Sequence, residues 1–294
     1  MFKPGTTINQ AMLVKSSEIA KTKNGKDYLS TILTTGKEDI KGVKWDTDRA
    51  PAPNAVVDVE AKVTEWNGTP QLTISRLLLN TELDPSEFAP QSPVSVDTLW
   101  FNAQRLIEDI ETVTLQDSVA ALYDNYKPYL LKAPAAKGAH HAYVGGLLYH
   151  STSMADMAAS LAQQTGASAD LCIAGALLHD IGKLHAYQMD IATIDMTEDG
   201  ILLDHMMLGC RMLVDWVPQP YLRDLQHIIL SHHGTKEMGS PVTPKFLEAW
   251  IIHLVDMLDS RAAMIRENEV PNSIWTKKQW FMEPQLIRRD GYEN

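Results

Sequence analysis

The stretch LLHDIGKL, residues 177–184, decides how the larger part of this chain is expected to fold. It places His179 and Asp180 side by side at the end of the apolar run AGALL, and Gly182 and Lys183 follow them. Histidine and aspartate are costly to bury unless they are paired or bound to a metal ion. We therefore expect these two side chains to be held at a binding site.

The helix expected from Ala142 to Gln164 carries apolar residues at three- and four-residue steps, and His150 lies on that apolar face. A single histidine there would usually be a hydrogen-bonded core residue. Further histidines and aspartates follow at intervals of about one helix plus a return, at His179–Asp180, His205, His232–His233 and Asp256. Successive helices of a bundle can each direct such a ligand to one shared point.

Imidazole and carboxylate ligands together suit a divalent transition metal such as Mn, Fe, Co, Ni or Zn. The two cysteines, Cys172 and Cys210, have no CxxC spacing, which disfavours a structural zinc site or a disulfide framework. A carboxylate can bridge two ions, so Asp180 and the excess of histidines are compatible with a two-metal catalytic centre.

Residues 6–79 predict a small antiparallel β-barrel. The β-rich segments are TTINQAMLV, DYLSTILTT, DIKGVKW, AVVDVEAKVTEW and PQLTISRLLL. Asn-Gly pairs at 24–25 and 67–68 are strong hairpin signals, because both residues tolerate a positive φ. Five short strands fit an OB-fold, the barrel that binds oligonucleotides, and an SH3-like barrel is the alternative.

This barrel carries aromatic residues beside cations, as single-strand binding requires. The candidate nucleic-acid contacts are Tyr28, Trp45, Trp66, Lys44 and Arg76, with His141 added from the segment before the His150 helix. The same residues also suit a barrel core with solvated lysines, and the sequence leaves both interpretations open.

Composition and charge predict two domains of different character. Residues 1–80 carry 11 Lys and Arg against 9 Asp and Glu, whereas the whole chain has a net charge of −11. We assign residues 1–80 to the OB-like domain, 81–96 to a linker, 97–268 to a helical domain and 269–294 to a tail with Trp275, Trp280 and Phe281. The apolar and aromatic surplus suggests a homo-oligomer. No run is long enough for a membrane helix and no signal peptide is recognised, so we expect a cytoplasmic protein.

The pattern H…HD…D, filled by His150, His179–Asp180 and Asp256, resembles the HD-domain metallophosphohydrolase superfamily. His205 and the histidine pair of LSHHG resemble its two-metal members, although the GYP motif of one phosphodiesterase branch is absent after His233. With the OB-like barrel, the runs HHAYVGGLLYH, ALLHDIGK and LSHHG resemble the YhaM-type 3′→5′ exoribonucleases over residues 6 to about 264.

The resemblance implies a full ligand set and a reaction. The family's ligands fall on His150, His179, Asp180, His205, His232, His233 and Asp256. It implies two divalent ions, with Mn²⁺ favoured and Mg²⁺ possible, and a metal-activated hydroxide that releases nucleoside 5′-monophosphates from single-stranded RNA. DNA is a further possible substrate, since no motif reports a contact to the 2′-hydroxyl. Some relatives carry a glutamate where this chain has Gly146, which argues against a third ion.

Lys183 stands three residues after Asp180, so if the helix continued through Gly182 its ammonium would lie on the ligand face and reach the scissile phosphate. A surface lysine near a helix end is the alternative. His140 and His141 are expected to flank the site, with Asp259 as the substitute for Asp256 on the same helix face. The remaining histidines, which are His185, His227 and His253, are not placed among the ligands.

Two other functions fit the same residues. An HD-type phosphohydrolase could act on a small cyclic or linear nucleotide, with the barrel serving regulation or assembly. A nucleic-acid-binding module could retain the HD site only for structure, although an intact set of seven candidate ligands disfavours this. Degradation of oligonucleotides to mononucleotides separates the three.

Overall fold

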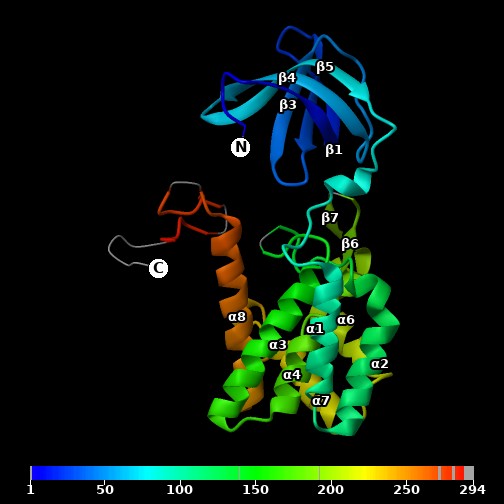
Figure 1. The fold of residues 1–294 in the computed structure, drawn as a ribbon, viewed down its shortest axis with the longest axis vertical. Helices are drawn as coiled ribbons and strands as arrows, with labels where there is room; N and C mark the ends of the chain where they lie inside the picture. Colours follow the sequence, from blue (N-terminus) through cyan, green and yellow to red (C-terminus); the bar gives the residue numbers. More distant parts are fainter. Residues whose placement is uncertain (1, 139, 192, 271–272, 280–281, 288–294) are drawn as a thin grey trace. The chain divides into compact units, whose positions relative to one another are not determined.

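The computed structural model describes residues 2–138, 140–191, 193–270, 273–279 and 282–287. The chain divides into two compact units: Met1–Gln91 with Met189–Thr193, and Ser92–Gln188 with Ile194–Asn294. In Figure 1 the first unit is a β-barrel in blue and cyan, and the second consists of helices in green, yellow and orange. The predicted fold class, a small barrel followed by a helical bundle, is confirmed.

Five strands close the first unit into a barrel of order β1-β2-β3-β5-β4. They are β1 Thr7–Lys21, β2 Asp27–Thr34, β3 Asp39–Trp45, β4 Val56–Trp66 and β5 Thr69–Leu79. Strands β3 and β5 pair in parallel, and the other neighbours are antiparallel. The turn between β4 and β5 is Asn67–Gly68, with φ of 49° and 78°, which is the backbone a two-residue hairpin needs.

The barrel encloses its own apolar core. Its buried residues alternate along the strands and include Met12, Val14, Leu33, Val57, Val59, Val63 and Leu72. A second, smaller cluster joins Leu13 and Val56 to Leu83, Phe88 and Ile191. Ile191 comes from a segment far along the chain, between the short strands β6 Tyr187–Met189 and β7 Ile194–Met196, which pair with each other. Nothing in the local sequence indicated this excursion.

The acidic and proline-rich segment that follows β5 contains little regular structure. A 3₁₀ turn, η1 Pro85–Phe88, is capped by Asp84, whose side chain accepts a hydrogen bond from the Ser86 amide. The two units divide between Gln91 and Ser92, inside the segment expected to be a linker.

The second unit is built from helices. They are α1 Val96–Glu108, α2 Val113–Leu130, α3 Gly146–Thr165, α4 Ala169–Leu178, α5 Lys183–Ala186, α6 Glu198–Leu213, α7 Tyr221–Ser231 and α8 Leu247–Glu267, with a 3₁₀ turn, η2, at Lys236–Met238. Helix α3 was expected to begin at Ala142 but begins at Gly146, because Gly145 takes a left-handed conformation with φ of 75° and turns the chain into the helix.

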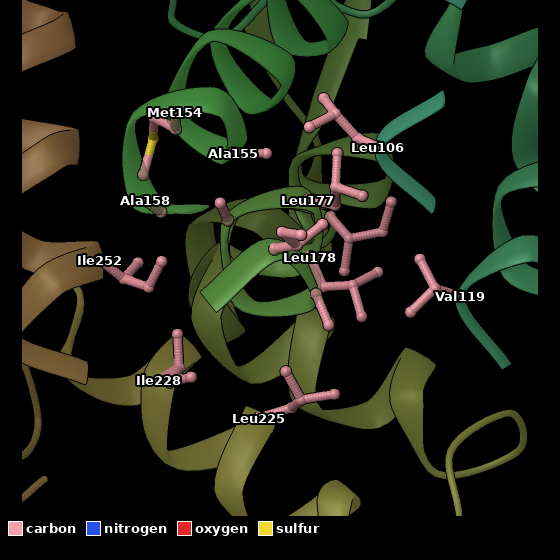
Figure 2. Close-up of a cluster of buried hydrophobic side chains, with 14 of the residues drawn as sticks. Leu106, Val119, Met154, Ala155, Ala158, Leu177, Leu178, Leu225, Ile228 and Ile252 are labelled. Carbon is pink, nitrogen blue, oxygen red and sulfur yellow. The ribbon is translucent and has the colours of Figure 1, made fainter. Parts of the chain in front are cut away.

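Helix α4 is the centre of this bundle. It packs against α3, α7, α8, α1 and α2 and buries every residue from Cys172 to Leu178. Figure 2 shows Leu177 and Leu178 surrounded by Met154 and Ala158 of α3 and Ile228 of α7. A helix that is apolar all round can only be stable when fully enclosed. The run AGALL is therefore the core, and it delivers the residues after it to a fixed place.

Two further features concern the chain outside these cores. None of the helices in the described ranges is long and apolar enough to cross a membrane. In the tail, Trp275 is 49% exposed. Trp280 and Phe281 lie outside the described residues.

Candidate metal centre

Five segments of the second unit bring polar side chains to one buried point. His150 comes from α3, His179 and Asp180 from the end of α4, His205 from α6, His232 and His233 from the end of α7, and Asp256 from α8. The exposed fractions of His150, His179, Asp180 and His232 do not exceed 2%. The structure thus gathers the complete set of candidate ligands that the sequence indicated.

Asp180 lies at the middle of this group. Its Oδ1 is 3.4 Å from Nε2 of His205 and 3.6 Å from Nε2 of His232, and its Oδ2 is 3.2 Å from Nε2 of His179 and 3.8 Å from Nε2 of His150. Each of the two carboxylate oxygens therefore faces two histidines. This is the arrangement in which a carboxylate can bridge two ions.

The outer members of the group extend it in two directions. Nε2 of His150 lies 3.3 Å from Oδ1 of Asp256. The ring of His233 lies 4.1 Å from that of His232 and 5.3 Å from that of His205, measured between centroids. Among the described residues, three trios have ligand atoms within 4.8 Å of one another: His150, His179 and Asp180, then His205, His232 and His233, and also His141, His150 and Asp259.

The histidines are oriented by hydrogen bonds on their other nitrogen. Nδ1 of His179 lies 2.8 Å from the carbonyl of Ala176, and Nδ1 of His232 lies 2.6 Å from that of Ile229. A carbonyl oxygen only accepts, so each Nδ1 carries the proton and donates it. The Nε2 atom of each ring then has a lone pair, which is directed at the common point.

Carboxylates do the same for two further rings. Nδ1 of His150 lies 2.7 Å from Oδ2 of Asp259, and Nδ1 of His205 lies 2.9 Å from Oδ1 of Asp204. A carboxylate behind an imidazole fixes its tautomer and raises its basicity as a ligand. Sequence reasoning treated Asp259 only as a substitute for Asp256 and missed Asp204, although Asp204 directly precedes a candidate ligand.

These orientations leave acceptor atoms without partners. Within the described residues, the buried side-chain atoms that lack a hydrogen bond are Nε2 of His150, His179, His205 and His232, Oδ1 of Asp180, Nδ1 of His140, Oδ1 of Asn54 and the hydroxyl of Ser240. The first five converge on one place. Oδ1 of Asp180 lies 3.4 Å from Nε2 of His205 and 3.6 Å from Nε2 of His232, and lone pairs at such distances repel unless a cation lies between them. The donor set therefore fits divalent metal ions.

The proton affinities of the cluster point the same way. Burial lowers the pKa of His150, but Asp256 and Asp259 more than offset this and raise it to about 9. Burial raises the pKa of Asp180, yet Lys183 and the surrounding histidines hold it well below its ordinary value. Burial lowers the pKa of His232 well below its usual range. The site thus holds ionised carboxylates and strongly attracts positive charge.

Lys183 lies beside the central carboxylate, although by another backbone route than the one expected. Helix α4 ends at Leu178 and the chain makes a tight turn before α5 begins at Lys183. The Lys183 ammonium is 2.5 Å from Oδ2 of Asp180 and only 8% of the residue is exposed. Burial lowers its pKa, but Asp180 raises it by more, so the ammonium stays charged.

Gly182 allows this turn to touch α6. A Cβ atom at Gly182 would lie 1.9 Å from the His205 carbonyl oxygen and 2.4 Å from the Gly209 amide nitrogen. Only a residue without a side chain fits there. At the contact, α6 breaks its helical course at Asp204, where φ is 64° and ψ is 155°.

His141 belongs to the support of the centre. It is 3% exposed, its Nε2 lies 2.8 Å from Oδ2 of Asp259, and its Nδ1 lies 2.7 Å from the Tyr143 hydroxyl. Both ring nitrogens are engaged inside the helical unit, which leaves little of the ring for the nucleic-acid contact expected from the sequence. His140 is nearer to that description: its ring centroid is 5.6 Å from that of His150, and burial lowers its pKa to about 3.

The other histidines take different positions. Nδ1 of His253 donates to the carbonyl of His232, 2.8 Å away, and its ring occupies the space above Gly234. His227 accepts a hydrogen bond from the Lys245 amide, and His185 is exposed beside Tyr126. None of the three belongs to the group around Asp180.

On the barrel, two of the candidate contacts form a pair. The rings of Tyr28 and Trp45 lie 5.2 Å apart between centroids, and Trp45 is 50% exposed. Trp66 is 67% exposed and pairs with Thr69 at the turn between β4 and β5. Lys44 is half-buried and Arg76 is exposed.

Comparison with known proteins identifies a domain family for the helical unit and relatives that cover most of the chain. A family model described as HD domain matches residues 147–261. A protein of Oceanobacillus iheyensis named 3′-5′ exoribonuclease YhaM is 27% identical over 304 residues, covering 98% of this chain and 96% of the relative. The protein of that name from Bacillus subtilis is 30% identical over 274 residues, covering 89% and 87%.

One solved structure also matches part of the chain. It is the HD domain of the phosphodiesterase PgpH from Listeria monocytogenes, at 20% identity and a TM-score of 0.32, covering 51% of this chain and 79% of that one. At this score the likeness supports no argument about fold or mechanism.

Proposed function

The chain belongs to the YhaM 3′-5′ exoribonuclease family and is a metal-dependent phosphodiesterase, and from this premise we propose that it hydrolyses single-stranded RNA from its 3′ end to nucleoside 5′-monophosphates. One observation carries the proposal: four imidazole nitrogens and one carboxylate oxygen, all buried and all without hydrogen-bond partners, converge on a single point. Such a donor set has the chemistry of a divalent-metal site that acts on phosphate.

We assign the ligands by their positions around Asp180. The proposed set is His150, His179, Asp180, His205, His232, His233 and Asp256, with Asp180 between two ions. Manganese is the favoured metal because the family resemblance implies it, and the imidazole and carboxylate ligands also suit Fe, Co, Ni and Zn. Two ions are preferred over three, since a Cβ atom at Gly146 would lie 2.0 Å from the His141 carbonyl oxygen, which leaves no room for a further ligand there.

When bound, divalent ions lower the pKa of a coordinated water and take up negative charge that develops on phosphate oxygens. The protein's own residues prepare this chemistry. Asp259 holds the proton of His150 on Nδ1, so that Nε2 is free to coordinate. Lys183 keeps a buried positive charge next to Asp180, where it can contact the scissile phosphate and hold it in place.

His140 is proposed to contact the substrate. Its Nδ1 is buried and without a hydrogen bond, and the ring lies beside that of His150. Its lowered pKa keeps the ring neutral, so that it can donate one hydrogen bond and accept another.

The barrel is proposed to hold the strand. The pair of half-buried Tyr28 and exposed Trp45 offers a stacking surface on β2 and β3, and Lys44 precedes Trp45 in sequence. Because Trp45 and Trp66 lie on different strands, β3 and β4, we propose that they contact different nucleotides. Arg76 is exposed on β5 and would contact the backbone. We keep residues 1–80, 81–96, 97–268 and 269–294 as the proposed functional division.

Other parts of the proposal concern the setting of the enzyme. A cytoplasmic location is supported by the two cysteines, Cys172 and Cys210, which are free and buried as in a reduced protein. Self-association is supported by exposed apolar side chains on one helix, α8, which are Leu247, Trp250, Leu254, Met257 and Leu258.

The deciding experiment is a metal-dependence assay. Protein stripped of metal is incubated with 5′-labelled single-stranded RNA or DNA, with Mn²⁺ or Mg²⁺ added back. A ladder that shortens from the 3′ end only with metal supports the proposal and reports the sugar preference. Asp180→Ala should abolish it, whereas Asp117→Ala, which removes an exposed carboxylate on α2, should not. No shortening with any metal, but hydrolysis of a cyclic nucleotide, would instead favour the small-substrate phosphohydrolase.

A further inference from the structure

We propose that Asp204 is a positioning residue: it turns His205 toward Asp180 for metal coordination, and the chain accepts a strained backbone to place it there. The inference rests on the proposed metal site and adds a residue to it. It is carried by the backbone at Asp204, by its two side-chain contacts and by the way the neighbouring turn is packed.

The backbone of Asp204 is unusual for its residue type. With φ of 64° and ψ of 155° it occupies a region used almost only by glycine, inside a segment that is otherwise helical on both sides. The other non-glycine residues with positive φ include Asn54 and Asn67, which are asparagines in turns, where such a φ is tolerated. Asp204 lies in no turn of that kind, so the surrounding structure has to maintain its conformation.

One oxygen of Asp204 makes two contacts across the break. Its Oδ1 lies 3.0 Å from the amide nitrogen of Met206, which caps the helical segment that follows. The same oxygen lies 2.9 Å from Nδ1 of His205. The ring therefore donates its Nδ1 proton to the carboxylate, and Nε2 is directed toward Oδ1 of Asp180 at 3.4 Å. One side chain thus fixes both the local helix start and the orientation of the ring.

The break also sets where the backbone of His205 lies. Its carbonyl oxygen sits against Gly182, so closely that no Cβ atom fits between them. A regular helical residue at 204 would continue one straight helix from Glu198 to Leu213, and the His205 carbonyl would leave this contact. The strained backbone at Asp204 is therefore needed for the contact between the segment that carries Asp180 and the segment that carries His205.

The simpler interpretation is that Asp204 only caps a helix. Three variants distinguish a positioning role of Asp204 from a capping role alone. Asp204→Gly relieves the strain and removes the carboxylate, Asp204→Ala removes the carboxylate but keeps the strain, and Asp204→Asn keeps an acceptor oxygen. Ser168→Ala is the matched control, because Ser168 caps α4 by accepting from the Leu171 amide and lies away from the ligands.

Two quantities are measured on each purified, metal-stripped protein. The first is the melting temperature without metal, and the second is the affinity for Mn²⁺ from calorimetric titration. Asp204→Gly should melt about 2–12 °C above the parent. It should nevertheless bind Mn²⁺ about 10- to 100-fold less tightly than the parent does. Asp204→Ala should lose the same affinity and melt lower, and Asp204→Asn should recover only part of the affinity, because the amide keeps an acceptor oxygen but lacks the charge.

Ser168→Ala should melt lower while binding Mn²⁺ as the parent does. Parent-like Mn²⁺ affinity in both Asp204→Gly and Asp204→Ala would overturn the proposal and leave Asp204 as a helix cap. If the parent protein itself bound no Mn²⁺, the proposed metal site would fail, and this inference with it. A parent that binds Mn²⁺ but degrades no RNA would contradict only the proposed substrate.

Discussion

Replacement of Gly182 by alanine should disable the metal centre without touching a ligand. The new Cβ atom would lie 1.9 Å from the His205 carbonyl oxygen, whereas real Cβ contacts stay beyond 3.0 Å. The turn and α6 therefore have to separate by about 1.1 Å, the difference between those two distances. That movement widens the 3.4 Å gap between Nε2 of His205 and Oδ1 of Asp180.

The magnitude follows from this displacement. A misplacement of about 1 Å can cost about 100-fold in rate. Forcing a methyl group into a closed contact costs about 1–3 kcal/mol of unfolding free energy. For a helical unit of this size, that loss corresponds to a melting temperature lower by roughly 2–12 °C. We expect Gly182→Ala to bind Mn²⁺ weakly and to degrade RNA at least about 100-fold more slowly.

Two other glycines provide a graded control. A Cβ atom at Gly209 would lie 3.4 Å from the Gly182 nitrogen, a tolerable contact, and one at Gly138 would meet nothing within 4 Å. The expected order of damage is Gly182→Ala, then Gly209→Ala, then Gly138→Ala, which should match the parent. Circular dichroism confirms folding, titration calorimetry measures Mn²⁺ binding, and a labelled RNA measures turnover. A folded Gly182→Ala protein with parent-like Mn²⁺ affinity would refute the reasoning.

Three further predictions concern individual side chains of the centre. Lys183→Ala should lower kcat on RNA by about 100-fold or more and leave the metal content unchanged. Lys236→Ala, which removes an exposed lysine of η2, should change neither quantity. An unchanged kcat in Lys183→Ala would exclude Lys183 from the reaction. Asp259→Asn should weaken Mn²⁺ binding about 10- to 100-fold, because it removes the charge behind Nδ1 of His150, and parent-like binding would contradict that role. Mn²⁺ affinity should rise as the pH increases toward 9, since the metal displaces the proton held on His150. Burial lowers the pKa of His150, but Asp256 and Asp259 raise it to about 9. The metal-free protein should lose stability over the same rise in pH, from about 6.5 to 9, because a raised folded-state pKa stabilises only below it; a flat pH profile for both quantities would show that His150 does not carry that proton.

The sequence predicted the fold because its strongest local signals agree with the tertiary structure. The segments in which apolar and polar residues alternate form the strands of the barrel, and the Asn-Gly pairs form turns between them. The uninterrupted apolar run before His179 forms the central helix. The candidate ligands were found because they follow one another at intervals of about one helix, and helices of a bundle converge. These features depend on neighbours in sequence, so local patterns report them.

Features that depend on distant backbone contacts could not be predicted. The position predicted for Lys183 depended on a helix that continued through Gly182, but the carbonyl of His205 packs there and a turn replaces the helix. Asp259 was ranked only as a substitute ligand, because nothing in its helix indicates that His141 and His150 share one of its oxygens. The insertion of Ile191 into the barrel's smaller cluster likewise has no local signal.

The five segments that meet around Asp180 also make the proposed ions cross-links of the chain. Each ion would close loops between helices that otherwise meet through apolar packing and a few polar contacts, such as that of His150 with Asp259, and its binding energy adds to the stability of the helical unit alone. Chelation should therefore produce two separate unfolding transitions on heating. The helical unit would unfold at a lower temperature, whereas the melting temperature of the barrel, which has its own core, would not change. Hydrogen exchange would report the same division, with amides of α3, α4 and α8 losing protection while those of the strands keep theirs.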